Sequence, residues 1–119
     1  MKRLLPIIVV LVACHSILIG VLLITHGAGL FDYFGWKPAG NRFFFHQVGV
    51  FHVVLAVIYV GEYFRYRRVN SIILAKFAAL VFLMIEYIWL TPQTPILLAG
   101  LGDGAIGAVV ALSWVLSRK

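Results

Sequence analysis

Two histidines, His15 and His52, lie near the middle of separate apolar stretches of this chain. Ionisable groups in such surroundings are energetically costly, and in membrane proteins they commonly mark functional sites. Two facing imidazoles can hold a haem iron from both sides, and one membrane histidine can bind the magnesium of a chlorophyll. Hydrogen bonds between helices would satisfy the same imidazoles without any cofactor. We therefore treat this pair as candidate cofactor ligands.

A second group of polar residues comes from four different apolar stretches and lies near the same end of each. Its members are His26, His46, Glu86 and Asp103. Two histidines and two carboxylates suit Zn²⁺, Fe²⁺ or Mn²⁺, but the Glu-x-x-His motif of di-iron bundles is absent. The four side chains could instead line a polar pocket for a quinone or a lipid head group, or pair with one another for packing alone. We expect a shared pocket and leave its ligand open.

Two charged residues at the opposite ends of their stretches have structural explanations. Glu62 can pair with Arg65 about one turn further along. Lys76 can extend its amino group to the nearby membrane surface. Outside these groups, the sequence has no nucleophile–base pair, phosphate-binding glycine loop or Cys-x-x-Cys motif. We expect no catalytic activity from the chain on its own.

The composition indicates that these residues are positioned by membrane helices. Of the 119 residues, 63% are hydrophobic and 12% are charged, whereas soluble domains are about half apolar and about 25% charged. A chain this short cannot bury so much apolar surface in a water-facing core. The net charge of +6 does not indicate nucleic-acid binding, because the basic residues lie at the junctions between apolar stretches. Cys14 has no second cysteine with which to form an intrachain disulfide.

Four apolar stretches are long enough to cross a bilayer as helices, which takes roughly 20 residues each. They cover about residues 4–25, 43–64, 71–90 and 95–116. Short connections favour antiparallel neighbours, so residues 1–119 are predicted to form one all-α domain, an integral membrane four-helix up-down-up-down bundle. Gly100, Gly104, Gly107 and Ala111 recur at helical spacing in the last stretch. They predict close packing on another helix, preferably of the same chain.

The distribution of basic residues predicts the orientation. One side of the four spans would carry seven lysines and arginines and the other side two, and the basic side faces the cytoplasm. Both termini are therefore predicted to be cytoplasmic.

Several motifs resemble those of the DoxX-like families of small bacterial four-helix membrane proteins. They are "GAGLFDYFGW" after the first span, "FHQVGVFHVVLAVIYV" in the second, "ILAKFAALVF" in the third and "GLGDGAIGAVVAL" in the fourth. The resemblance implies a basic residue early in the third span, which Lys76 matches. It also implies an acidic residue before small residues in the last span, which Asp103 and Gly104 match. The number of histidines departs from the family. The family's namesake is linked to thiosulfate oxidation coupled to quinone.

These observations predict a multi-pass protein of the bacterial cytoplasmic (inner) membrane, surrounded by lipid. The first functional hypothesis is an accessory or structural subunit of a larger membrane complex linked to electron transfer or quinone. The alternatives are a stand-alone binding protein for a lipid or quinone, and a subunit that binds haem or a chlorophyll-type tetrapyrrole. Assembly into a larger complex or a homo-oligomer is expected, and binding of nucleic acid is not.

Overall fold

The computed structural model describes residues 4–35 and 42–119, and within these ranges every long element is a helix. The elements are α1 (Leu4–Tyr33), α2 (Arg42–Tyr66), α3 (Asn70–Ile85), the π-helical turn η1 (Glu86–Leu90) and α4 (Thr94–Ser117). Four helical segments are long and apolar enough to cross a membrane: Leu4–Gly27, Phe43–Tyr66, Asn70–Leu90 and Thr94–Ser117. The predicted all-α class and the four apolar helices are confirmed, with each predicted boundary within two residues of the segment found.

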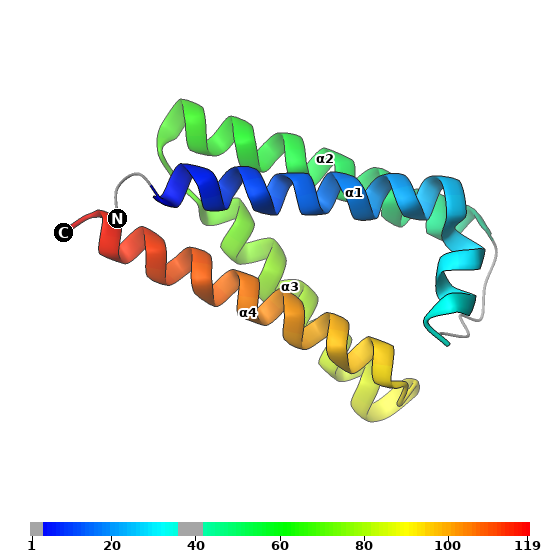
Figure 1. Ribbon diagram of the computed structural model, residues 1–119. Coiled ribbons are helices and arrows are strands. Elements are labelled where there is room, and N and C mark those ends of the chain that lie inside the picture. The colour runs from blue at the N-terminus through cyan, green and yellow to red at the C-terminus, as the bar shows by residue number, and fades with distance from the viewer. Residues whose placement is uncertain (1–3, 36–41) are drawn as a thin grey trace.

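The helices form two pairs, with α1 along α2 and α3 along α4 (Figure 1). The pairs meet at the end of the molecule that carries both termini and diverge toward the other end (Figure 1). Most contacts between helices are made within each pair. The two pairs therefore approach each other most closely at the end that carries the termini (Figure 1).

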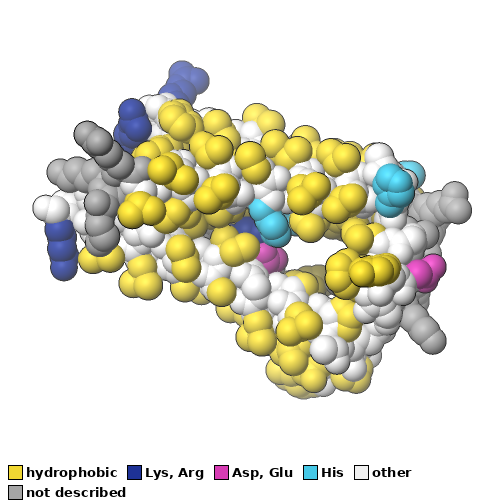
Figure 2. Space-filling view, viewed as in Figure 1, with side chains coloured by type: hydrophobic (Ala, Val, Ile, Leu, Met, Phe, Trp, Pro, Cys, Tyr) yellow, Lys and Arg dark blue, Asp and Glu magenta, His cyan; other side chains and the backbone are white. Residues whose placement is uncertain are grey.

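The pairs are joined by a hydrophobic core at the end that carries the termini. Side chains from all four helices contribute to it, including Val9, Tyr59, Ile72 and Val110. Val69, in the connection between α2 and α3, is fully buried in the same core. Its neighbours Arg67, Arg68 and Asn70 are exposed, so Val69 anchors the connection to the core while α3 begins at the surface. Elsewhere large apolar side chains are exposed along every helix (Figure 2), as expected for surfaces that face lipid.

Two glycines allow α1 and α2 to cross in backbone contact. A Cβ atom on Gly20 would lie 2.7 Å from the carbonyl oxygen of Gly49, and a Cβ on Gly49 would lie 2.7 Å from that of Gly20. Such close approach is the usual device for packing helices in lipid, where no hydrophobic force drives them together. The sequence analysis did not identify this crossing.

The predicted glycine stripe of α4 packs on α3 of the same chain, as expected. A Cβ on Gly100 would lie 2.6 Å from the Met84 side chain, and one on Gly104 would lie 2.9 Å from Leu80. Gly107 faces the Cβ of Lys76, at 3.1 Å. The stripe thus fixes which residues of α3 and α4 lie opposite each other.

The first helix extends past its predicted end at Thr25. It continues to Tyr33 across a kink at His26, where φ is −133° and ψ is 22°. Gly27 and Gly29 each weaken a helix by about 1 kcal/mol, which is why the sequence predicted a break. Packing offsets this cost, because Gly27 is buried against Phe45 and the Phe45 ring lies 4.7 Å from that of Phe31. The rest of the predicted connection, residues 36–41, lies outside the described residues.

Candidate functional site

The most buried charged group of the described residues is an ion pair between α3 and α4. Lys76 Nζ lies 2.5 Å from Asp103 Oδ1, and the side chains are 4% and 18% exposed. Both residues lie within segments long and apolar enough to span a membrane. A charge in such surroundings is tolerated when it is paired or faces a polar cavity, and here each charge neutralises the other.

The helix register explains this pairing. Lys76 lies opposite Gly107, and Asp103 precedes Gly107 by one helical turn. The glycine leaves room for the stem of the lysine, which extends along α4 to the carboxylate. This finding corrects the expectation that Lys76 extends to the membrane surface. The amino group of Lys76 is held by Asp103 of α4 instead of reaching that surface.

The two mid-span histidines lie near this ion pair. His15 of α1 and His52 of α2 are both within electrostatic range of Lys76 and Asp103, and His52 is also within range of His15. His15, His52, Lys76 and Asp103 are called the polar cluster below. It takes one residue from each of the four helices. Binding of a cofactor by His15 and His52 stays a prediction.

One polar atom of the cluster is left without a protein partner. His52 Nδ1 is buried and makes no hydrogen bond to any described residue. Leaving a buried polar atom unsatisfied costs about 1–3 kcal/mol. An unsatisfied atom of this kind therefore needs an explanation, and one explanation is a bound molecule that supplies the missing hydrogen bond.

An opening separates the two helix pairs (Figure 2). Figure 2 shows it passing between the α1/α2 pair and the α3/α4 pair, with a histidine, an acidic and a basic side chain grouped at its closed end. We call this space the inter-pair opening. It is bordered by helices whose remaining surfaces are predominantly apolar. An apolar molecule with one polar end would fit these surroundings.

Tyr59 adds a further polar group that the sequence analysis missed. It is 1% exposed and lies within electrostatic range of Asp103. Tyr59 follows His52 by seven residues, which places both on the same face of α2. The seven-residue spacing could have identified Tyr59 from the sequence, because a tyrosine two helical turns from a mid-span histidine lies on the same side of the helix.

The four residues predicted to share an outer pocket are divided among three places. Asp103 belongs to the polar cluster, and Glu86 Oε1 accepts a hydrogen bond of 2.8 Å from the Thr91 hydroxyl. That bond spans η1, whose π-helical turn is closed by Thr91 N–H donating to Glu86 O at 2.7 Å. Only His26 and His46 line a common recess, of about 220 Å³.

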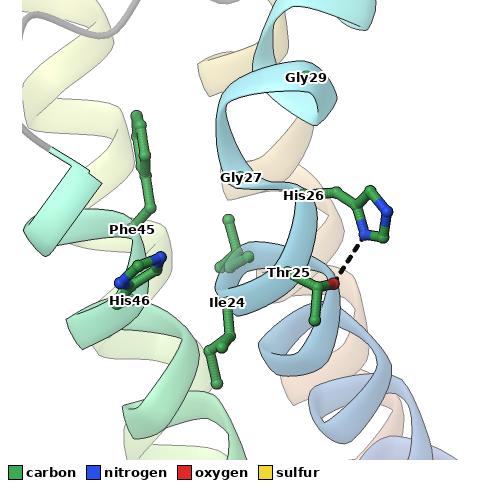
Figure 3. Close-up of a pocket in the computed structure, with 8 residues that line it drawn as sticks. Ile24, Thr25, His26, Gly27, Gly29, Phe45 and His46 are labelled. Carbon is green, nitrogen blue, oxygen red and sulfur yellow. Dashed lines mark hydrogen bonds between the residues drawn. The ribbon is translucent and has the colours of Figure 1, made fainter.

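The two histidines of this recess do not face each other. His26 is turned away from α2, and its Nδ1 lies 2.7 Å from the Thr25 hydroxyl, whereas His46 lies on α2 beside Phe45 (Figure 3). Among the described residues, no three histidine, cysteine, aspartate or glutamate side chains are grouped to hold a metal ion. The two-histidine, two-carboxylate metal site considered above is therefore not assembled by the fold.

Glu62 also has a different partner from the predicted Arg65. Its Oε2 accepts a 2.8 Å hydrogen bond from the Ser71 backbone N–H and a second, short one from the Ser71 hydroxyl. Ser71 lies in the first turn of α3, whose N-terminus has no side-chain cap of its own. The short connection brings this turn to the end of α2, so the carboxylate binds one backbone N–H and one hydroxyl instead of an exposed arginine.

Comparison of the chain with protein-family models, curated proteins and solved structures finds no match. The resemblance to DoxX-like proteins therefore stays a prediction from the sequence.

Proposed function

We propose that this chain is a small integral membrane protein that binds an apolar molecule with a polar head group, of the quinone or lipid class, in the inter-pair opening. The observation that carries the proposal is the polar cluster, to which each of the four helices contributes an ionisable side chain. Side chains of the same types, a histidine, an acidic and a basic one, lie at the closed end of the opening (Figure 2). Ligand sites commonly combine apolar walls with a few convergent polar groups.

The cluster offers chemistry suited to a carbonyl or hydroxyl oxygen. The Lys76 ammonium has three N–H donors, of which the contact with Asp103 uses one. An imidazole can donate or accept at either nitrogen, and His52 Nδ1 is the unsatisfied atom. A bound quinone would place its ring oxygens near the polar cluster and its apolar tail between the two helix pairs. Hydrogen bonding alone is required of these residues, without a catalytic step.

The membrane setting is part of the proposal. We place the protein in the bacterial cytoplasmic membrane as an up-down-up-down bundle with both termini in the cytoplasm. The seven-to-two distribution of basic residues supports this orientation. The end of the described structure that carries both termini also carries Arg65, Arg67, Arg68 and Arg118.

The second candidate is the accessory subunit of a larger complex, and the opening itself favours it. Because the two helix pairs diverge (Figure 1), a helix of a partner subunit could occupy the space assigned here to a small molecule. Migration of gently extracted protein on a native gel separates the two proposals. A band at the size of the chain or a small homo-oligomer favours ligand binding, and a much larger band favours the complex.

Titration with a short-tailed quinone tests the proposed function directly. Decylubiquinone added to the purified protein in neutral detergent should raise its midpoint of thermal unfolding, because a ligand that binds only the folded state stabilises it. His52→Leu should abolish the increase. His46→Leu is the matched control, since it removes an imidazole from the same helix outside the cluster, and it should keep the increase.

Equal responses of the two variants, or no response of the wild-type protein to quinone, would refute quinone binding at the cluster. An optical spectrum of the same preparation tests the tetrapyrrole alternative. A Soret band that His15→Leu and His52→Leu each remove would assign the two histidines to haem instead.

A further inference from the structure

A second cavity lies at the opposite end of the molecule from the wide end of the inter-pair opening. It has a volume of about 490 Å³ and is lined by Tyr63, Tyr66, Arg67, Arg68, Trp114 and Arg118, among others. The end of α2, the connection to α3 and the end of α4 form its walls. Three arginines thus converge on one cavity, and nothing in the proposed function uses them.

These arginines are not neutralised by the protein. Within residues 4–35 and 42–119 the recorded ion pair is that of Lys76 with Asp103. Glu62, the acidic residue nearest in sequence to Arg67 and Arg68, is engaged by Ser71, and Asp103, the one nearest to Arg118, is paired with Lys76. An anion supplied from outside would therefore meet guanidinium groups without competition from a carboxylate.

Aromatic rings hold two of the guanidinium groups in place. Arg118 Cζ lies 4.2 Å from the centre of the Trp114 ring, and Arg67 Cζ lies 5.6 Å from that of Tyr63. A guanidinium that stacks on a ring by its face keeps the N–H donors at its edge available. Such donors bind phosphate oxygens in pairs with favourable geometry. The cavity is thus organised for a phosphate group.

The position of the cavity indicates where the phosphate comes from. Tryptophan, tyrosine and arginine near the end of a span are the residues expected at the level of lipid head groups. Leu5 contributes an apolar wall to the same cavity, which suits the start of an acyl chain. Basic pockets between membrane helices on the cytoplasmic side bind anionic head groups. We propose that this cavity binds the phosphate of an anionic phospholipid through Arg67, Arg68 and Arg118.

The test compares lipids and variants of equal charge. The protein in neutral detergent is titrated with short-chain phosphatidylglycerol, with phosphatidylcholine of the same chain length and with inorganic phosphate, and the midpoint of thermal unfolding is followed. Phosphatidylglycerol should bind, phosphatidylcholine should bind weakly because its choline offsets the phosphate charge, and inorganic phosphate should have little effect.

The double variant Arg67→Gln/Arg118→Gln should bind phosphatidylglycerol about 100-fold more weakly, because each arginine loses its charge-assisted hydrogen bonds to the phosphate. Arg65→Gln/Lys119→Gln removes the same charge outside the cavity and should bind like wild type. Arg118→Gln alone, in the last residues of the chain, keeps the test available if the double variant does not fold, and about a tenfold loss is expected.

Three results would overturn the proposal. Equal losses in the cavity variants and the control would mean that overall charge attracts the lipid. Equal stabilisation by inorganic phosphate would make the cavity a site for free phosphate. A wild-type protein that does not respond to phosphatidylglycerol would exclude the lipid site altogether.

Discussion

The ion pair between Lys76 and Asp103 is the residue-level feature on which the fold and the proposed site both depend. Taking two charges out of water is costly, and their attraction repays that cost only with good geometry. The pair is therefore weak evidence for stability and better evidence for specificity. It forms in the register in which Lys76 lies opposite Gly107.

Removing one partner should destabilise the protein more than removing both. Lys76→Met or Asp103→Leu alone leaves an uncompensated buried charge, with an expected cost of about 3–5 kcal/mol in the free energy of unfolding. Lys76→Met/Asp103→Leu should recover most of that loss. Chemical unfolding in detergent measures all three variants.

His46 supplies the control for this comparison, because it lies on the recess with His26 and not with the pair. The effects of His46→Leu and Asp103→Leu should add, as expected for independent sites. A double variant at positions 76 and 103 that is as unstable as the sum of its single variants would show that the two residues are not coupled.

At this scale the sequence identified the important residues but not their partners. His15, His52 and Asp103 could be selected because ionisable groups are costly in apolar spans. The pairing of Asp103 with Lys76 could not be predicted by counting depth along each helix, since depth does not say which side chains of a neighbouring helix a residue faces. The register depends on glycines at positions 100, 104 and 107, whose contacts only the structure shows.

Among the elements, α3 depends on a carboxylate from its neighbour. Glu62 binds the Ser71 N–H and hydroxyl at the first turn of α3, which performs the role of an N-terminal cap. Glu62→Ala should lower the free energy of unfolding by about 1–2 kcal/mol, because it leaves these donors without an acceptor. Glu62→Gln keeps an acceptor oxygen and should cost less. Equal effects of the two substitutions, measured by thermal unfolding, would argue against capping.

The α1/α2 crossing gives a sharper test. Gly20→Ala places a methyl group within 2.7 Å of the Gly49 carbonyl oxygen, and such overpacking costs about 1–3 kcal/mol. Gly61→Ala is the matched control on α2, since no atom lies within 4 Å of its added Cβ. This control should be neutral or slightly stabilising, because alanine is the better helix former. If the Gly61→Ala variant unfolds at a lower temperature than the Gly20→Ala variant, the proposed backbone contact between α1 and α2 is refuted.

The four spans were predictable because apolar length alone defines them, and the break near Thr91 followed from two prolines. The continuation of α1 through Gly27 was not predictable, because it depends on a contact with Phe45 of another helix. Gly20 and Gly49 are single glycines within consecutive spans, which is only a weak indication that the two helices pack closely there. Their opposition could not be deduced without the register of the two helices.

For the whole molecule, the distribution of arginines predicts orientation. Reporter fusions to the C-terminus, and to the N-terminus, should both read as cytoplasmic. A variant with Arg65, Arg67 and Arg68 changed to Gln is a useful comparison, because it removes most of the charge of one connection and should give a mixed orientation. A periplasmic C-terminus in the unmodified protein would contradict the proposed topology.

The divergence of the helix pairs has a mechanical consequence for the surrounding bilayer. A molecule that is narrow at the end with its termini and broad at the other (Figure 1) occupies unequal areas in the two leaflets. In the proposed orientation the broad end lies in the outer leaflet, where it displaces more lipid. Such a shape matches a membrane that curves toward the cytoplasm, so many copies together would favour curvature of that sign. A molecule bound in the inter-pair opening would hold the helix pairs apart at that end, and so would determine how much curvature each copy of the protein favours.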